Sequence, residues 1–153
     1  MDPFLAPHLR VLEDLRRQTA EMVAPLDDSQ INRTVPGLKN SVGILLRHMA
    51  GSERYWIGEV VGGRPAQRQR DAEFEHDRVR KGDLLGEFDR VAALTREVLG
   101  GLSRDDLLQE VTLQRSQGPV QETRAYAVLH AMEHLAYHVG QLRFLTRLLE
   151  RGA

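Results

Sequence analysis

The stretch HAMEHLAYHVGQLRFLTRLL, residues 130–149, combines a helical repeat of apolar residues with two histidines four residues apart. Residues at this spacing lie one above the other on one face of an α-helix, so the imidazoles of His134 and His138 can reach a single ion. At about 100° per residue, His130 and Gln141 fall on the same face. That face also carries three apolar residues that predict its burial: Ala127, Leu145 and Leu148. Buried imidazoles lose their hydration unless a partner replaces it, and a metal ion is an efficient partner.

A third histidine, His48, lies in another stretch with a helical repeat, residues 41–61. It shares a helix face with residues that mark the inward side: Ile44, Leu45, Ser52, Tyr55 and Trp56. The polar faces of the two helices can therefore meet, and three histidines would leave part of the coordination sphere of an ion open, as in catalytic zinc sites. The alternative is a hydrogen-bonded core histidine beside a pair that arises by chance. The spacing alone leaves both interpretations open.

The remaining polar and aromatic residues favour structural roles. His8 and His76 lie in a terminal turn and a charged stretch, and we expect both to be solvated. His130 is expected to be a pocket or packing residue rather than a ligand. Tyr55 and Trp56 favour the core over a substrate platform, because large aromatic side chains dominate protein interiors. Carboxylates on helices are usually solvated, which gives no catalytic assignment to three glutamates: Glu53, Glu59 and Glu133.

Apolar periodicity predicts four long helices, over residues 5–23, 41–61, 82–99 and 123–150. Asn40 or Ser41 offers an N-cap for the second helix, and Thr123 offers one for the fourth. The length of 153 residues is ordinary for one domain with a buried core. The sequence therefore predicts an all-α four-helix bundle formed by one domain, residues 1–153.

Long connections join these helices. Residues 27–40 are rich in turn formers, with a short helical turn at residues 28–32. Residues 64–81 are highly charged, and we expect an exposed linker there. Residues 103–122 include the helical turn SRDDLL and then a short hairpin or an extended loop about Gly118 and Pro119. Connections of this length allow a bundle topology other than simple up-and-down.

Composition narrows the classes of function. The formal net charge is -1, from 21 basic and 22 acidic residues, which gives no support to recruitment of nucleic acid or an anionic membrane. The chain has no apolar run long enough to span a bilayer and no signal-peptide pattern, so we expect a cytoplasmic protein. It also has no cysteine. Any thiol chemistry must therefore come from a small-molecule partner.

Two strings together carry a family resemblance: NSVGILLRHMAGSERYWIGEVVGGR, residues 40–64, and the stretch quoted first, with its E-H-x-x-x-H-x-G-Q core. They resemble the DinB-like (DinB/YfiT-like) superfamily of bacterial metal-binding proteins over essentially the whole chain. The resemblance implies an up-down-down-up bundle, commonly a homodimer, with a divalent metal bound by three ligands: His48, His134 and His138. It matches Gly140, which would permit close helix approach, and Gln141, which would face the site and support a ligand or pack against a helix rather than bind the metal. Zinc or nickel is the expected ion, with manganese or iron as alternatives.

The resemblance leaves the reaction open. Some members look like S-transferases that use bacillithiol or mycothiol, some are thiol-dependent isomerases, and many have no assigned reaction. A metal with an open position can bind a thiol and lower its pKa, which makes a thiol S-transferase our leading hypothesis. The alternatives are a non-enzymatic metal-binding stress-response protein and a metal-dependent hydrolase. Four arginines near the predicted helices could hold the acidic groups of such a thiol, and nothing in the sequence selects among them: Arg47, Arg54, Arg124 and Arg143.

Overall fold

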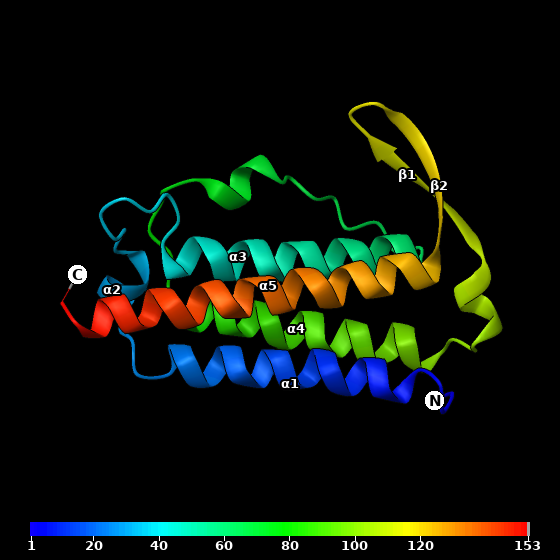
Figure 1. The fold of residues 1–153 in the computed structure, drawn as a ribbon, viewed down its shortest axis with the longest axis horizontal. Helices are drawn as coiled ribbons and strands as arrows, with labels where there is room; N and C mark the ends of the chain where they lie inside the picture. The colour runs from blue at the N-terminus through cyan, green and yellow to red at the C-terminus, as the bar shows by residue number, and fades with distance from the viewer. Residues whose placement is uncertain (153) are drawn as a thin grey trace.

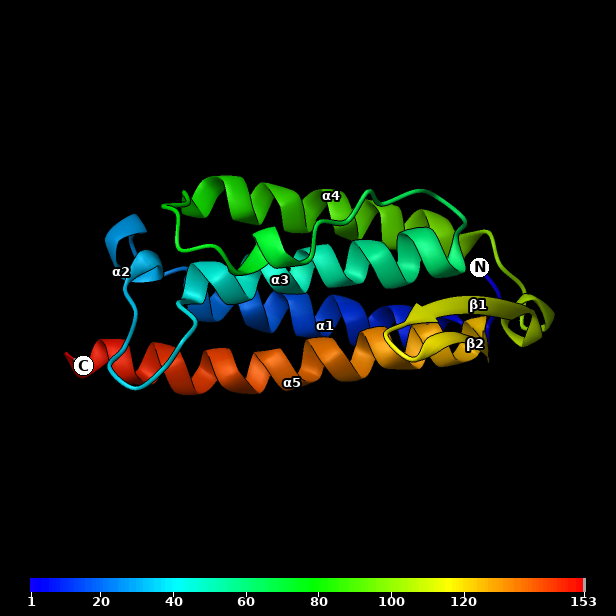
Figure 2. The same ribbon diagram turned by 90° about the horizontal axis from the view of Figure 1, so that it is seen from above.

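The computed structural model describes residues 1–152, apart from the side chain of Arg115, and four long helices make up most of it. These are α1 (Ala6–Val23), α3 (Val42–Glu53) with its continuation η1 (Arg54–Val61), α4 (Lys81–Gly100) and α5 (Arg124–Glu150). They lie side by side in a bundle, with α1 and α5 running in one direction and α3 and α4 in the other (Figures 1 and 2). The predicted all-α, up-down-down-up bundle is therefore confirmed.

Short elements fill the connections. They are α2 (Asp28–Asn32), the 3₁₀ turns η2 (Asp71–Phe74) and η3 (Asp105–Leu108), and the antiparallel strands β1 (Glu110–Arg115) and β2 (Gly118–Thr123). The helical turns predicted at 28–32 and within SRDDLL are present, and the segment about Gly118 is a hairpin rather than an extended loop. This hairpin rises from one end of the bundle, beside the start of α5 (Figure 1). No helix within residues 1–152 is long and apolar enough to cross a bilayer.

The second long helix has the predicted extent but changes its hydrogen bonding partway. Ser41 caps it by accepting a hydrogen bond from the backbone N–H of Ile44 (3.3 Å). From Arg54 onward the helix widens into the π form, in which the N–H of Gly62 reaches the carbonyl of Ile57 (2.9 Å). Such wide turns are rare and are frequent at functional sites. This one carries Tyr55 and Trp56.

The interior is mostly apolar but encloses one charged cluster. Glu53 is only 2% exposed, although the sequence predicted a solvated carboxylate there, so that prediction was wrong. Arg16 of α1 donates hydrogen bonds to both carboxylate oxygens of Glu53, through Nε (3.2 Å) and Nη2. The hydroxyl of Thr95 in α4 donates a third hydrogen bond (2.6 Å). The charge of Glu53 is therefore matched inside the protein by groups from two other helices.

The linker between η1 and α4 is also more ordered than expected. It returns along the length of the bundle above α3 (Figures 1 and 2), and Asn32 holds its far end by donating to the carbonyl and accepting from the N–H of Val79 (2.8 and 2.9 Å). Midway, η2 turns Glu73 inward, where it is 7% exposed. The prediction of an exposed linker was therefore wrong for this part of residues 64–81.

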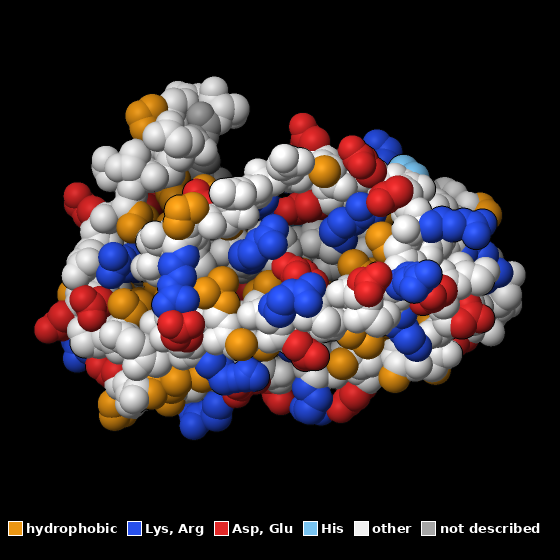
Figure 3. All heavy atoms as spheres, turned by 180° about the vertical axis from the view of Figure 1, so that it is seen from behind, with side chains coloured by type: hydrophobic (Ala, Val, Ile, Leu, Met, Phe, Trp, Pro, Cys, Tyr) orange, Lys and Arg blue, Asp and Glu red, His pale blue; other side chains and the backbone are white. Residues whose placement is uncertain are grey.

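Charges on the outside of the bundle are mixed. Figure 3 shows the face behind that of Figure 1, where Lys and Arg side chains are interspersed with Asp and Glu. His76 is exposed, as predicted, whereas His8 is only partly exposed. A Cβ at Gly140 would meet nothing within 4 Å, so the close helix approach expected at this glycine is not made within the described chain.

Candidate metal centre

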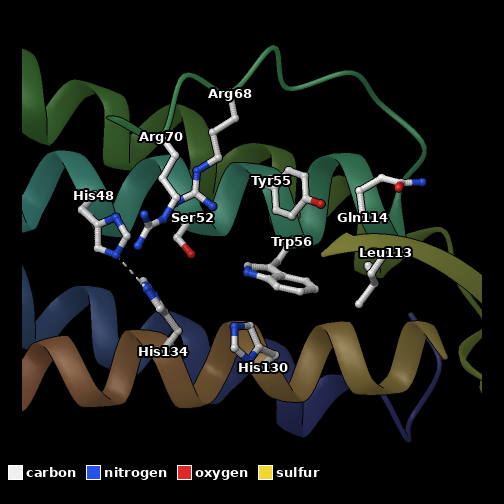
Figure 4. Close-up of a pocket in the computed structure, with 10 residues that line it drawn as sticks. All are labelled: His48, Ser52, Tyr55, Trp56, Arg68, Arg70, Leu113, Gln114, His130 and His134. Carbon is white, nitrogen blue, oxygen red and sulfur yellow. Dashed lines mark hydrogen bonds between the residues drawn. The ribbon is translucent and has the colours of Figure 1, made fainter. Parts of the chain in front are cut away.

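Three histidines from two helices meet in the interior. His48 comes from α3, and His134 and His138 come from α5. The Nε2 atom of His134 lies 2.9 Å from Nε2 of His48 and 3.2 Å from Nε2 of His138. Figure 4 shows His48 and His134 pointing toward each other from their separate helices. Within residues 1–152, these three form the cluster of side chains close enough to hold one metal ion.

Hydrogen bonds on the opposite side of two rings define their tautomers. Nδ1 of His48 lies 2.8 Å from a carboxylate oxygen of Glu73, so Nδ1 carries the proton. Nδ1 of His138 lies 2.7 Å from Oε1 of Gln141, whose amide nitrogen donates to the hydroxyl of Tyr137 (3.0 Å). Both Nε2 atoms therefore present lone pairs toward His134.

These lone pairs cannot all be satisfied within the cluster. In a neutral imidazole only one ring nitrogen is a donor, so Nε2 of His134 can donate to one neighbour at most. At least one of the lone pairs on His48 and His138 is then left without a donor in a largely buried place, which is unfavourable. A divalent cation satisfies all three nitrogens, because its ligand distance of about 2.0 Å to each imidazole suits nitrogens about 3 Å apart. The donor set therefore fits a metal ion.

The protonation states suit this use as well. Burial, followed by the neighbouring imidazoles of His138 and His48, lowers the pKa of His134 from 6.5 to about 3. Burial also lowers the pKa of His138. Both rings are then neutral at pH 7, which is the form that binds metals, so an ion need not displace protons to enter.

Glu73 contacts the candidate site and is a residue that the sequence did not reveal. Burial acts to raise the pKa of its carboxyl, but hydrogen bonds from Arg68 and His48 outweigh this and leave the pKa below its ordinary value. Arg68 holds both carboxylate oxygens, through Nε (2.7 Å) and Nη2 (2.8 Å). An ionised carboxylate on the far nitrogen of a histidine orients the ring and raises its basicity toward a metal. Glu73 thus supports His48 as Gln141 supports His138.

A glycine makes room for this carboxylate. A Cβ added at Gly51, three residues after His48, would lie 2.8 Å from the carboxyl carbon of Glu73. The ring of Phe74 covers His48 with ring centres 4.6 Å apart. The glycine one turn after the histidine is the only trace that this arrangement leaves in the sequence near the site, and by itself it names no partner.

A cavity of about 450 Å³ opens beside the histidines. Ten residues line it (Figure 4): His48, Ser52, Tyr55, Trp56, Arg68, Arg70, Leu113, Gln114, His130 and His134. Trp56 is 6% exposed and belongs to the core, as predicted, yet it also forms part of this wall with Tyr55. The hairpin contributes Leu113 and Gln114. The candidate metal centre thus borders a space of the size that small ligands occupy.

His130 occupies the pocket position expected of it. Its ring lies 4.3 Å from that of Trp56 and is stacked on Tyr126 at 5.9 Å, centre to centre. Its ring centre is 6.2 Å from that of His134. His130 therefore belongs to an aromatic wall one turn away from the three converging nitrogens.

The arginines that the sequence offered as anion holders do not line this cavity. Arg47 pairs with Asp77 and Arg54 pairs with Glu87. Arg143 donates to Gln18, and Arg124 is also absent from the lining. The arginines at the cavity come instead from the linker, Arg68 and Arg70. The sequence could not select them, because it did not show that the linker folds over α3.

Solved structures with a fold similar to this helical bundle are known. The chain is similar to a conserved protein from Enterococcus faecalis (TM-score 0.79, 16% identity, 97% of each chain covered). It is also similar to a DinB-like protein from Bacillus subtilis (TM-score 0.71, 17% identity, 94% of this chain and 92% of that one). A third similar structure is the mycothiol-dependent maleylpyruvate isomerase (TM-score 0.67, 13% identity), where 90% of this chain matches 60% of a longer one.

Sequence comparison identifies the family. No curated protein matches the sequence. The family model described as the DinB superfamily matches residues 12–142, which include the three converging histidines, Glu73 and Gln141. This match covers most of the chain, and the similar structures share its helical fold. The protein therefore belongs to the DinB superfamily.

Proposed function

We propose that the protein is a metal-dependent S-transferase that uses a small-molecule thiol. The observation that carries this proposal is the convergence of three histidine Nε2 atoms, with His48 and His134 lining a cavity, in a chain without cysteine. His48, His134 and His138 would hold a divalent ion through these atoms. When bound, such an ion lowers the pKa of a thiol and presents it as a thiolate at neutral pH.

The cavity supplies what the transfer needs from the protein. The sulfur of the thiolate would attack an electrophilic carbon, so that a C–S bond forms as the leaving group departs with its bonding electrons and the thiol proton goes to solvent. Trp56 and His130 form an aromatic wall against which an apolar electrophile can lie. Buried side chains on this wall also limit the water that would compete as a nucleophile. One structural neighbour is a mycothiol-dependent isomerase, which supports a thiol reaction.

The competing functions are distinguished by the residues at the cavity. Hydrolysis at a metal-bound water is commonly assisted by a carboxylate base, but no Asp or Glu is among the described residues that line the cavity. Glu73 is engaged by Arg68 and His48 and lies behind the ring of His48. A purely structural ion would need no cavity beside it. The transferase therefore agrees best with the site.

Cobalt substitution tests the proposal. Metal-free protein is loaded with Co²⁺ and titrated with 2-mercaptoethanol, while absorbance reports a thiolate-to-cobalt charge-transfer band. We expect about one metal ion per chain by elemental analysis and a band that saturates with thiol. His134→Ala should lose at least about 100-fold in metal affinity, because it leaves two ligands. His76→Ala, which removes an exposed histidine, is the matched control and should behave as the wild type.

Three outcomes separate the alternatives. Cobalt binding without a thiol band would favour the non-enzymatic metal-binding protein. Hydrolysis of an ester such as 4-nitrophenyl acetate, unaffected by thiol and lost in His134→Ala, would favour the hydrolase. A wild type that remains folded and refuses cobalt, zinc and nickel would remove the metal centre itself. His130→Ala should retain metal, and full loss in that variant would show that the ligand set is wrong.

A further inference from the structure

The two arginines that line the cavity are in different electrostatic situations. Arg68 has a side chain only 13% exposed and holds both oxygens of Glu73. Its guanidinium also lies over the ring of Tyr55, 5.6 Å from the ring centre. The positive charge of Arg68 is thus balanced by a carboxylate of the protein.

Arg70 has no such balance. Its guanidinium lies over the ring of Phe74, 5.3 Å from the ring centre. It forms no ion pair with any carboxylate in the part of the chain that the structure describes. Figure 4 shows the side chains of Arg68 and Arg70 reaching from the linker toward His48 and Ser52. Arg70 therefore adds an uncompensated positive charge at the edge of the candidate metal centre.

The charged side chains at the cavity leave a net positive charge there. The charges of Arg68 and Glu73 cancel each other. No Asp or Glu is among the described residues that line the cavity. With a divalent ion held by the histidines, Arg70 and the ion would repel each other across the cavity unless an anion lay between them.

We propose that this cavity binds a ligand with a carboxylate group, and that Arg70 is the residue that holds the carboxylate. The planar guanidinium presents paired N–H donors that match the two oxygens of a carboxylate. The opposite wall, with Trp56 and His130, accommodates the apolar or flat remainder of the ligand. This inference rests on the proposed thiol transfer, because it names the chemical class of a reactant at that same site. The carboxylate can belong to the thiol or to the electrophile.

Matched probes test the inference on cobalt-loaded protein. The first arm compares mercaptoacetate with 2-mercaptoethanol, two thiols that differ in the carboxylate, by the charge-transfer band. The second arm keeps 2-mercaptoethanol saturating and titrates benzoate, with tryptophan fluorescence as the readout because Trp56 is the one tryptophan of the chain. Both arms use the wild type, Arg70→Gln, Arg70→Lys and the control Arg78→Gln, which removes an exposed arginine from the same linker.

Arg70→Gln should weaken mercaptoacetate about tenfold and leave 2-mercaptoethanol unchanged if the thiol carries the carboxylate. If the electrophile carries it, the same variant should weaken benzoate about tenfold. Arg70→Lys should keep part of the affinity and Arg78→Gln all of it. Equal affinities for Arg70→Gln and Arg78→Gln in both arms would overturn the inference. Absence of a thiol band with either thiol would instead defeat the proposed transfer, while a loss of benzoate binding in Arg70→Gln, then measured without thiol, would still support the role of Arg70.

Discussion

Two buried glutamates, Glu53 and Glu73, have nearly the same partners but lie in different parts of the molecule. Each is less than a tenth exposed, each is held by an arginine that contacts both of its oxygens, and each accepts one further hydrogen bond. For Glu53 that further donor is the hydroxyl of Thr95, and for Glu73 it is a ring nitrogen of His48. The two donors differ in their other contacts, because the second ring nitrogen of His48 faces His134 at the candidate metal centre.

The difference is one of location and consequence. Glu53 joins α3 to α1 and α4 in the middle of the bundle, so its hydrogen bonds act on the packing of helices. Glu73 belongs to the linker, and its hydrogen bond fixes the proton of a histidine whose other nitrogen faces the candidate metal centre. The same local chemistry therefore serves stability in one place and ligand orientation in the other.

Removal of the Glu53 carboxylate from the core should have the largest effect, and this effect is on stability. Glu53→Ala leaves the guanidinium of Arg16 buried without its counter-charge, and we expect the free energy of unfolding to fall by about 3–5 kcal/mol. Denaturant unfolding followed by circular dichroism measures it. The double variant Arg16→Met with Glu53→Leu should recover most of the loss, because apolar residues of similar volume can replace a buried ion pair. A Glu53→Ala protein as stable as the wild type would show that Glu53 does not stabilise the bundle.

Removal of the Glu73 charge should have the next largest effect, and this effect is on metal affinity. Glu73→Gln keeps the shape of the side chain but removes its charge, so metal affinity should fall about 10- to 100-fold while the bundle remains folded. Competition with a chelating dye measures the affinity. Glu75→Gln removes the charge of an exposed glutamate in the same linker and is the control. Stability loss without any change in metal affinity would show that Glu73 acts as Glu53 does.

The same carboxylate can be displaced without altering it. Gly51→Ala places a Cβ where the carboxyl group of Glu73 lies, so it should reproduce the weaker metal binding of Glu73→Gln. The substitution otherwise favours the helix, since alanine has the higher helix propensity. Retention of wild-type affinity in Gly51→Ala would show that the position of Glu73 is unimportant to the site.

The smallest expected effect is a pH dependence of stability that comes from His134. The lowered pKa of His134 means that the unfolded chain binds a proton below about pH 6.5, while the folded protein does not until about pH 3. Stability of the metal-free protein should therefore fall as the pH is lowered through this window, by about 1 kcal/mol between pH 6.5 and 5.5 for this residue. Urea unfolding in the presence of a chelator measures it. His134→Gln should flatten the dependence, whereas a slope unchanged in that variant would place the titrating group elsewhere.

Sequence reasoning recovered what depends on local periodicity. The four helices and the caps at Ser41 and Thr123 follow from apolar spacing and cap residues, and the structure confirms them. The inward faces of two helices also predicted that three histidines meet, and they do. Their binding of a metal remains a prediction.

What the sequence did not reveal depends on partners far away in the chain. Glu53 lies 37 residues from Arg16, and Glu73 lies 25 residues from His48. A carboxylate enters the interior only when a partner is already there to neutralise it, and no local pattern states which partner that is. The linker also makes its contacts with residues distant in the sequence, so the sequence predicts an exposed linker and does not single out Arg70.

The hairpin of β1 and β2 contributes Leu113 and Gln114 to the cavity wall. Of its residues with described side chains, Leu113 alone is nearly fully buried, at 2% exposed. Lifting the hairpin would return roughly one leucine side chain to water, at a cost of about 2 kcal/mol. A free-energy difference of that size would leave the raised form at about a few per cent of molecules. The hairpin side of the cavity is thus held by much less buried apolar surface than the side formed by the helices.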